Sequence, residues 1–253
     1  MPIVISSEHD IARLSLQTGP VNAMGPEFLA DLDAALDAAQ DARALVLTGA
    51  GSAFSAGLDL PRLLTLDETT ITGFIAAFSR VMEKVFLWPK PTVAALNGHA
   101  VAGGFVLASA CDYRLLARGP AKLGMTGVTL GIAYPSLVIA MLQYSVPKAA
   151  WHNVLLDGRL YDVEAAQSAQ LVESVVDPDV LLERATERAL GLCAADPGAY
   201  ARTKRMLKWE TVARAQSLQQ ESHAAFVSAL FSPEGRARLH ATVEKMKGTK
   251  NPR

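Results

Sequence analysis

The sequence predicts an α/β core followed by a region built only of helices. Over residues 1–196, short apolar runs rich in Val, Ile and Leu alternate with longer segments whose apolar residues recur at helical spacing. From Pro197 onward the spacing is almost entirely helical. We expect 1–196 to form the core, and 197–253, which is too short to fold well alone, to pack on a partner subunit.

Composition excludes several classes of protein. A net charge of −1 argues against a general nucleic-acid binder, and 50% hydrophobic residues favour a substantial core. Cys111 and Cys193 are the only cysteines, and the five histidines are scattered, so we expect neither a disulfide framework nor a metal site. Without a signal-peptide pattern or an 18-residue uncharged apolar stretch, a cytoplasmic enzyme with no membrane partner is expected.

The first elements follow from apolar spacing and turn residues. Apolar alternation around a polar turn predicts an opening hairpin of residues 3–5 and 11–16. Pro26 suits the first turn of a helix that extends to about Gln40. The run 44–48 has the continuous apolar character of a strand covered on both faces. A long amphipathic helix then carries Ile71, Phe78 and Val85 and ends before Pro89.

The later elements are assigned in the same way. A strand at 91–96 leads to a short buried helix at 105–110. Gly103 and Gly104 lie in its first turn, where the helix dipole favours an anion. Further strands are expected at 113–116, 122–125 and 172–176, and helices at 136–144, 147–156, after Asp162, and at 178–192, 197–209, 211–231 and 233–247.

Two glycine-containing stretches, each directly after an apolar strand, are the main candidates for a site. They read Ser55-Ala-Gly-Leu-Asp-Leu60 and Asn97-Gly-His-Ala-Val-Ala-Gly-Gly-Phe105. Small residues let the backbone approach a ligand closely, so what these stretches offer is peptide N–H groups. Two such donors aimed at one point form an oxyanion hole, which stabilises charge developing on a carbonyl oxygen.

Other sites suggested by the sequence fit less well. The run Gly49-Ala-Gly51 follows a strand, but Phe54 occupies the third glycine position of a dinucleotide motif and Pro61 interrupts its helix. There is no G-x-S-x-G elbow of a serine hydrolase. His99 lies within the second stretch, where a structural role is favoured over a catalytic one.

The motifs ALVLTGAGSAFSAGLDL, PTVAALNGHAVAGGFVLASACDYR and LGMTGVTLGIAYP, in this order, resemble the crotonase family of enoyl-CoA hydratases and isomerases. The resemblance extends from Val21 to Lys245. It implies a crotonase-like spiral of β-β-α units, with C-terminal helices that build a homotrimer or a homohexamer of two trimers. It also implies an acyl-CoA substrate, with coenzyme A present as part of that substrate and no separate cofactor.

The same resemblance assigns residues to the site. The oxyanion donors would be the backbone N–H groups of Leu58 and Gly103, which would hold the thioester oxygen as an enolate forms. Lys245 lies close to the sequence position at which members of that family have a lysine that reaches the CoA of a neighbouring subunit. Other substrate contacts are expected from Ala56, Gly57, Asp59, Leu60 and Gly104 around the thioester, and from Asn22, Ala23 and Met24 at the CoA nucleotide.

The sequence departs from the hydratase pattern at both catalytic glutamates. Val106 and Gly127 occupy those positions, and neither side chain transfers a proton. This argues against the usual hydration, and also against an isomerase that needs a glutamate at position 127. A carboxylate entering from elsewhere, Asp67 or Glu68, is the alternative. The acyl pocket is expected to be apolar and lined by residues 61–70 and the helix that follows.

The segment 125–134 resembles the matching segment of methylmalonyl-CoA decarboxylases in the same family, which also lack the glutamate pair. Thr126 and Tyr134 match a Thr and a Tyr there. Decarboxylation needs no base, because loss of CO₂ itself generates the enolate. Three hypotheses stay open: an enolate-forming enzyme of the family, a decarboxylase or thioester hydrolase, and an acyl-CoA binder without turnover.

Overall fold

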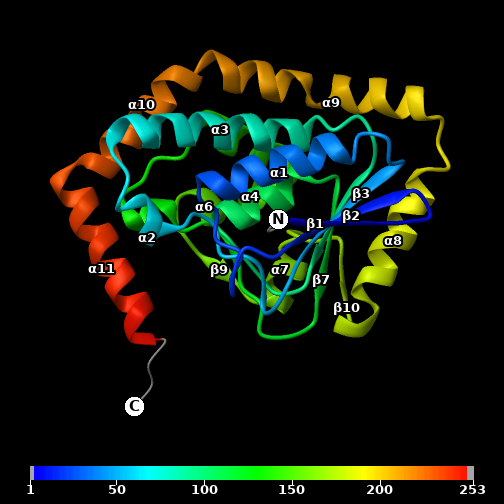
Figure 1. The fold of residues 1–253 in the computed structure, drawn as a ribbon, viewed down its shortest axis with the longest axis horizontal. Helices are drawn as coiled ribbons and strands as arrows, with labels where there is room; N and C mark the ends of the chain where they lie inside the picture. Colours follow the sequence, from blue (N-terminus) through cyan, green and yellow to red (C-terminus); the bar gives the residue numbers. More distant parts are fainter. Residues whose placement is uncertain (1–2, 250–253) are drawn as a thin grey trace.

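A six-stranded sheet crosses the computed structural model, which describes residues 3–249 (Figure 1). The strands lie in the order β1-β2-β3-β5-β7-β10; β1 pairs antiparallel with β2, and the other neighbours are parallel. The apolar runs predicted as buried strands are buried here on both faces. The strands are β1 (Ile3–Glu8), β2 (Ile11–Leu16), β3 (Ala44–Gly49), β5 (Thr92–Leu96), β7 (Tyr113–Ala117) and β10 (Ser174–Val176).

A second sheet, of four short strands in the order β4-β6-β8-β9, was only partly predicted. Strands of two or three residues are too short to show a hydrophobic period, and two of them lie within or beside the glycine-containing stretches. The chain thus passes from β3 to β4, and from β5 to β6, before each following helix. This repeated strand-strand-helix order confirms the predicted spiral. The strands are β4 (Ala53–Ser55), β6 (His99–Val101), β8 (Leu123–Gly124) and β9 (Leu160–Tyr161).

Helices pack against both sheets and place the site between them. All eight residues of α4 (Gly103–Ala110) are buried, so the glycine-containing helix start lies in the interior. Asp67 is the N-cap residue of the long helix α3 (Glu68–Phe86), so Glu68 lies in its first turn. The remaining elements of this region are α1 (Pro26–Ala38), α2 (Leu60–Leu63), α3 (Glu68–Phe86), η1 (Gly127–Leu130), α5 (Ser136–Ser145), η2 (Lys148–Ala150), α6 (Trp151–Leu155), α7 (Val163–Ser168), η3 (Pro178–Val180) and α8 (Leu181–Leu192).

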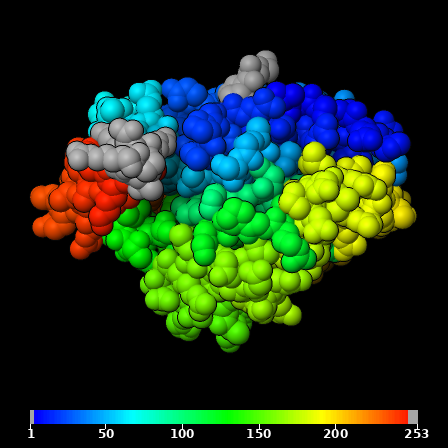
Figure 2. Space-filling model, turned by 90° about the horizontal axis from the view of Figure 1, so that it is seen from below, coloured from blue at the N-terminus to red at the C-terminus, as the bar shows by residue number. Residues whose placement is uncertain are grey.

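The C-terminal helices pack on the core of their own chain. Val212, Phe226, Leu230 and Leu239 belong to the main hydrophobic core, together with residues of the sheets. Figure 1 shows α9 along the top edge of the molecule, with α10 and α11 turning down one end; Figure 2 shows α11 (red) and α8 (yellow) at opposite ends. The described C-terminal helices are α9 (Pro197–Ser217), α10 (Gln219–Phe231) and α11 (Pro233–Thr249).

The expected helix break near residue 210 is wrong. The segment around Glu210 contains neither Pro nor Gly, so α9 continues to Ser217, and the break falls at Leu218. Packing of this region on a partner subunit stays a prediction. No helix within residues 3–249 is long and apolar enough to cross a lipid bilayer.

A buried ionic cluster fixes α9 to the core. The Asp112 carboxylate accepts hydrogen bonds from Lys204 Nζ at 2.6 Å, Lys208 Nζ at 2.8 Å and the Tyr200 hydroxyl at 3.0 Å. Burial alone would raise the pKa of Asp112, but the two ammonium groups outweigh it and hold that pKa below its usual value. All three donors come from one face of α9, so this cluster sets the position of the helix.

Candidate functional site

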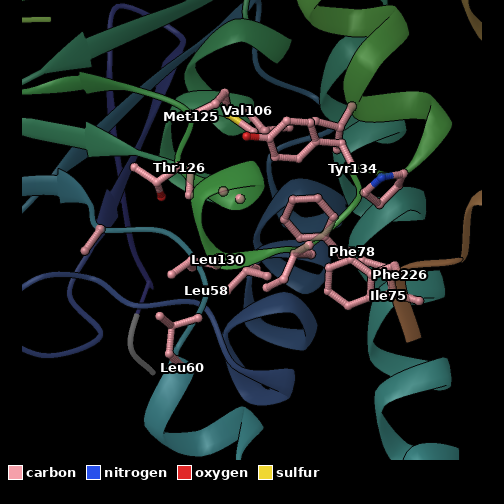
Figure 3. A pocket seen from close by; sticks show the side chains of 17 residues that line it. Leu58, Leu60, Ile75, Phe78, Val106, Met125, Thr126, Leu130, Tyr134 and Phe226 are labelled. Carbon is pink, nitrogen blue, oxygen red and sulfur yellow. The ribbon is translucent and has the colours of Figure 1, made fainter. Parts of the chain in front are cut away.

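An apolar pocket lies where the two glycine-containing stretches meet α3, α5 and α10 (Figure 3). Among the lining residues from the described part of the chain, Thr126 and Tyr134 are the only ones with side-chain oxygen or nitrogen atoms. In Figure 3 these two hydroxyls lie on one side of the pocket and the rings of Phe78 and Phe226 on the other. The lining residues are Ala56, Leu58, Leu60, Ile75, Phe78, Ala102, Gly103, Val106, Met125, Thr126, Gly127, Leu130, Ile132, Tyr134, Pro135, Val138 and Phe226.

The backbones of the two stretches touch at this pocket. Strands β4 and β6 run parallel as neighbours, which brings Gly57 beside Gly103. Gly57 has a φ of +88°, and a Cβ there would lie 2.6 Å from the Val101 carbonyl oxygen and 2.8 Å from the Gly103 nitrogen. Only glycine permits both this conformation and this approach. The predicted meeting of the two stretches is therefore observed.

Two peptide N–H groups at this contact lie outside the regular hydrogen-bond pattern. Leu58 forms a β-bridge with Met24, but the bridging bonds use the Gly57 carbonyl, at 2.8 Å, and the Asp59 N–H, at 3.0 Å. Gly103 is the first residue of α4, where an N–H has no acceptor within the helix. Both donors lie on residues that line the pocket. The arrangement suits an anionic oxygen, because the positive end of the α4 dipole is also there.

Ala102, which caps α4, holds an unusual backbone conformation. Its φ of 49° and ψ of −118° lie in a region that residues with a Cβ rarely adopt. The Ala102 N–H donates to the Gly124 carbonyl at 2.8 Å, and its carbonyl accepts from the Val106 N–H at 3.0 Å. These bonds hold the turn from which α4 begins, directly before Gly103 of the pocket lining.

The Asn22 side chain holds the backbone that leads into the first glycine-containing stretch. Its buried amide nitrogen donates to the carbonyls of Ala53, at 2.9 Å, and Ala50, at 3.2 Å, while its oxygen accepts from the Thr18 N–H. The side chain is thus fully used in fixing the loop that leads to Gly57. Met24 is buried and Ala23 half-buried. Contact of this segment with CoA stays a prediction.

The ring of Tyr134 occupies the space beside Gly127. A Cβ at position 127 would lie 2.4 Å from Tyr134 Cε1. The Tyr134 hydroxyl accepts a hydrogen bond from the Val128 N–H at 3.3 Å, which leaves its own proton available to the pocket. Burial raises the pKa of Tyr134, opposed in part by the N–H groups of Val128 and Gly127, so the phenol is protonated at neutral pH. Val106, the other position where a glutamate was expected, is buried in the pocket wall.

Several residues expected near the substrate lie elsewhere. Asp59 caps α2 by accepting from the Arg62 N–H, and Gly104 packs against the Ser55 carbonyl. Both residues therefore stabilise the backbone around the site. Lys245 is exposed on α11 and is not among the lining residues. Their contacts with substrate stay predictions.

The alternative carboxylates also lie outside the pocket lining. Asp67 is exposed and accepts the Thr70 N–H at 2.7 Å, as the cap of α3, and Glu68 is exposed at the start of that helix. The expectation that residues 61–70 line the acyl pocket is wrong: none of them is among the lining residues that the structure describes, and Leu63 packs into the hydrophobic core instead. The helix that follows does line it, through Ile75 and Phe78, and Phe226 of α10 is a lining residue that was not expected. Among residues 3–249, no group of three or more His, Cys, Asp or Glu side chains is placed to hold a metal ion.

Known sequences similar to this chain are described as enoyl-CoA hydratases or as members of the enoyl-CoA hydratase/isomerase family. A family model described as enoyl-CoA hydratase/isomerase matches residues 6–249. A putative enoyl-CoA hydratase of Thermus thermophilus is 38% identical over 192 residues, covering 74% of this chain and 75% of the relative. A probable enoyl-CoA hydratase of Rhizobium meliloti is 34% identical over 231 residues, covering 90% and 85%. An (E)-benzylidenesuccinyl-CoA hydratase of Thauera aromatica is 31% identical, covering 81% of each chain.

Solved structures share the fold. The human mitochondrial delta3-delta2-enoyl-CoA isomerase superimposes with a TM-score of 0.95 at 25% identity, covering 99% of this chain and 100% of that one. A probable enoyl-CoA hydratase of Mycobacterium tuberculosis gives a TM-score of 0.85 at 27% identity, covering 90% and 98%. The similarity to the isomerase therefore includes the C-terminal helices.

Proposed function

The chain belongs to the enoyl-CoA hydratase/isomerase family, and from this premise we propose that it converts an acyl-CoA thioester by holding the thioester enolate at the N–H groups of Leu58 and Gly103. The observation that carries the proposal is the backbone contact of the two glycine-containing stretches at an apolar pocket. Paired donors of this kind stabilise a developing oxyanion by a few kcal/mol. Coenzyme A enters as part of the substrate, and the proposal requires no other cofactor.

The reaction that suits this pocket best is decarboxylation. The lining residues include no carboxylate, imidazole or amine, so none of them activates water for hydration or moves a proton between carbons. Decarboxylation of a 2-carboxyacyl-CoA needs no base. The bond between the α-carbon and the carboxylate carbon breaks, CO₂ leaves, and the electron pair stays on the α-carbon and delocalises to the thioester oxygen as the enolate.

Tyr134 and Thr126 complete this scheme. The Tyr134 hydroxyl, protonated at neutral pH, orients the carboxylate or delivers a proton to the α-carbon of the enolate; the phenolate then recovers a proton from solvent. Thr126 offers a second hydroxyl on the same side of the pocket. The apolar remainder of the lining disfavours a charged carboxylate relative to neutral CO₂, which assists the bond cleavage.

The experiment supplies the purified protein with methylmalonyl-CoA and, separately, crotonyl-CoA, and identifies products by mass spectrometry. We expect propionyl-CoA and CO₂ from the first and no loss of enoyl absorbance from the second. Hydration of crotonyl-CoA at the same rate by the wild-type protein and by Tyr134→Phe would contradict the proposal. Release of free CoA would identify a thioester hydrolase, and binding without any product would identify an acyl-CoA binder.

Gly103→Val tests the donor pair directly. The added side chain starts 3.2 Å from Met24 Sδ and 3.4 Å from Leu58 Cδ2, at the thioester position, so turnover and acyl-CoA binding should be lost. Gly73→Val is the matched control, because a Cβ on this exposed residue of α3 meets nothing within 4 Å. Equal activity of the two variants would overturn the assignment of Gly103.

The remaining features of the proposal concern assembly and the CoA moiety. We expect a homotrimer or homohexamer in the cytoplasm, with the segment Asn22–Met24 beside the CoA nucleotide and Lys245 reaching the CoA of a neighbouring subunit. The position of Lys245 outside the pocket lining of its own chain is compatible with a role across a subunit boundary.

A further inference from the structure

One wall of the pocket comes from the C-terminal helices. Phe226, on α10, is the only lining residue beyond Val138. Its side chain is 2% exposed and lies with Phe78 and Ile75 of α3 on the aromatic side of the pocket, away from the hydroxyls of Thr126 and Tyr134 (Figure 3). An acyl group whose reacting carbons face those hydroxyls has the aromatic side left for its tail.

Two hydrogen bonds from consecutive residues fix α10 in this position. His223 Nε2 lies 2.9 Å from the Oγ of Ser79, which follows Phe78 on α3 and is buried. Ser222 Oγ accepts from the N–H of Ser136, the first residue of α5, at 3.0 Å. Phe226 lies three residues after His223, on the same face of α10. The helix is therefore hydrogen-bonded to α3 and α5, two of the elements that line the pocket.

From this geometry we propose that Phe226 sets the longest acyl group the pocket accepts, and that the Ser79–His223 hydrogen bond is one of the contacts that position Phe226. The inference rests on the proposed acyl-CoA function and extends it to the substrate tail. Phe226 contacts the substrate in this scheme, whereas Ser79 and His223 act only through the placement of α10. Their hydrogen bond joins α10 to the α3 turn that presents Phe78.

The test measures binding of saturated acyl-CoA thioesters with 2, 4, 6, 8 and 10 acyl carbons by calorimetry. For the wild-type protein we expect affinity to rise with chain length to a limit and then to fall. Phe226→Ala should move this limit by two or more carbons and bind the first excluded thioester about tenfold more tightly, because two further methylene groups become buried. Phe226→Leu should give an intermediate limit.

Leu230→Ala is the matched control on the same helix. Leu230 is also buried, at 1% exposed, but does not line the pocket, so this variant should lose stability without a change in the limit. Ser79→Ala and His223→Ala should each make the fall in affinity beyond the length limit less steep. The double variant should behave as either single variant does. His223→Gln, which keeps a hydrogen-bonding group at similar reach, should restore the wild-type limit.

The outcomes separate the two proposals. A wild-type protein that binds no member of the series overturns the proposed function and this inference with it. A wild-type protein that binds the series, with Phe226→Ala showing an unchanged limit, overturns the role of Phe226 alone. An unchanged limit in Ser79→Ala and His223→Ala, with Phe226→Ala altered, overturns the positioning role of the hydrogen bond. Thermal unfolding of each variant shows that the protein tested is folded.

Discussion

Gly127 and Tyr134 depend on each other, because the tyrosine ring fills the volume that a side chain at 127 would need. We expect Gly127→Ala to lower the free energy of unfolding by about 1–3 kcal/mol, since its methyl group overlaps Tyr134 Cε1. In a Tyr134→Ala background the same change should cost little. Urea unfolding of the four proteins in this double-mutant cycle measures the coupling, and an equal cost in both backgrounds would contradict the packing argument.

The Tyr134 hydroxyl should matter for turnover more than for binding. Tyr134→Phe keeps the ring over Gly127 and removes the proton donor, so we expect kcat for methylmalonyl-CoA to fall about 100-fold with little change in KM. Thr126→Val removes the other hydroxyl of the lining and separates the two contributions. Steady-state kinetics of both variants provide the measurement, and full activity of Tyr134→Phe would leave the phenol without a chemical role.

At the scale of elements, the attachment of α9 depends on one carboxylate. Asp112→Asn leaves the buried ammonium groups of Lys204 and Lys208, whose side chains are 6% and 4% exposed, without a counter-charge. We expect a loss of ~3–5 kcal/mol in the free energy of unfolding. Lys204→Met preserves one ion pair, so it should cost clearly less. Chemical denaturation compares the two variants, and the reverse order would show that the cluster is held by something other than Asp112.

The contact between α10 and α3 should respond to pH. Burial lowers the pKa of His223 below its ordinary value of about 6.5. As pH falls through that value, the unfolded chain takes up the proton before the folded chain does, so stability is present above the unfolded pKa and is lost below it. Urea unfolding at pH 7.5 and 5.5 should show a larger loss for wild type than for His223→Gln. Equal losses would mean that His223 does not contribute to the pH dependence.

Elements with a continuous apolar run or a regular apolar spacing were predictable, and those with neither were not. β3 and β5 are continuous apolar runs, and α3 has a regular apolar stripe, so the sequence identified all three. Strands β4 and β6 have only three residues each and are defined by parallel pairing between distant segments. The end of α9 was misplaced because Leu218, where the helix breaks, is neither Gly nor Pro.

In the candidate site, too, some residues were predictable from local sequence, whereas others are placed only by the folding of the whole molecule. The glycine-containing stretches carry a local signal, so the positions of Leu58 and Gly103 were predictable. Phe226 reaches the pocket only because α10 folds back over α3, which no local pattern encodes. The overlap of Tyr134 with Gly127 depends on the path of the turn between them, and it also needed coordinates.

The outer face of α9 supports a prediction about assembly. Met206 and Trp209 are 79% and 54% exposed and point away from the face of the helix that the Asp112 cluster anchors. We expect these side chains to be covered in the proposed trimer, so Trp209→Glu should shift the protein to monomers in sedimentation-velocity experiments without loss of helix content. Leu182→Glu, at a 37% exposed position of α8, is the control that should leave assembly intact. A wild-type monomer would refute the expectation.

The Tyr134 ring over Gly127 also limits how such a site can change during evolution. A glutamate cannot return to position 127 in one step, because its first carbon would meet the ring before its carboxylate reached the pocket. Replacing Tyr134 first would remove the phenol while no carboxylate is yet present. Either substitution made alone is therefore expected to give a less stable or less active protein. We expect the residues at 127 and 134 to change together across related sequences, with the pair differing between members that catalyse different reactions.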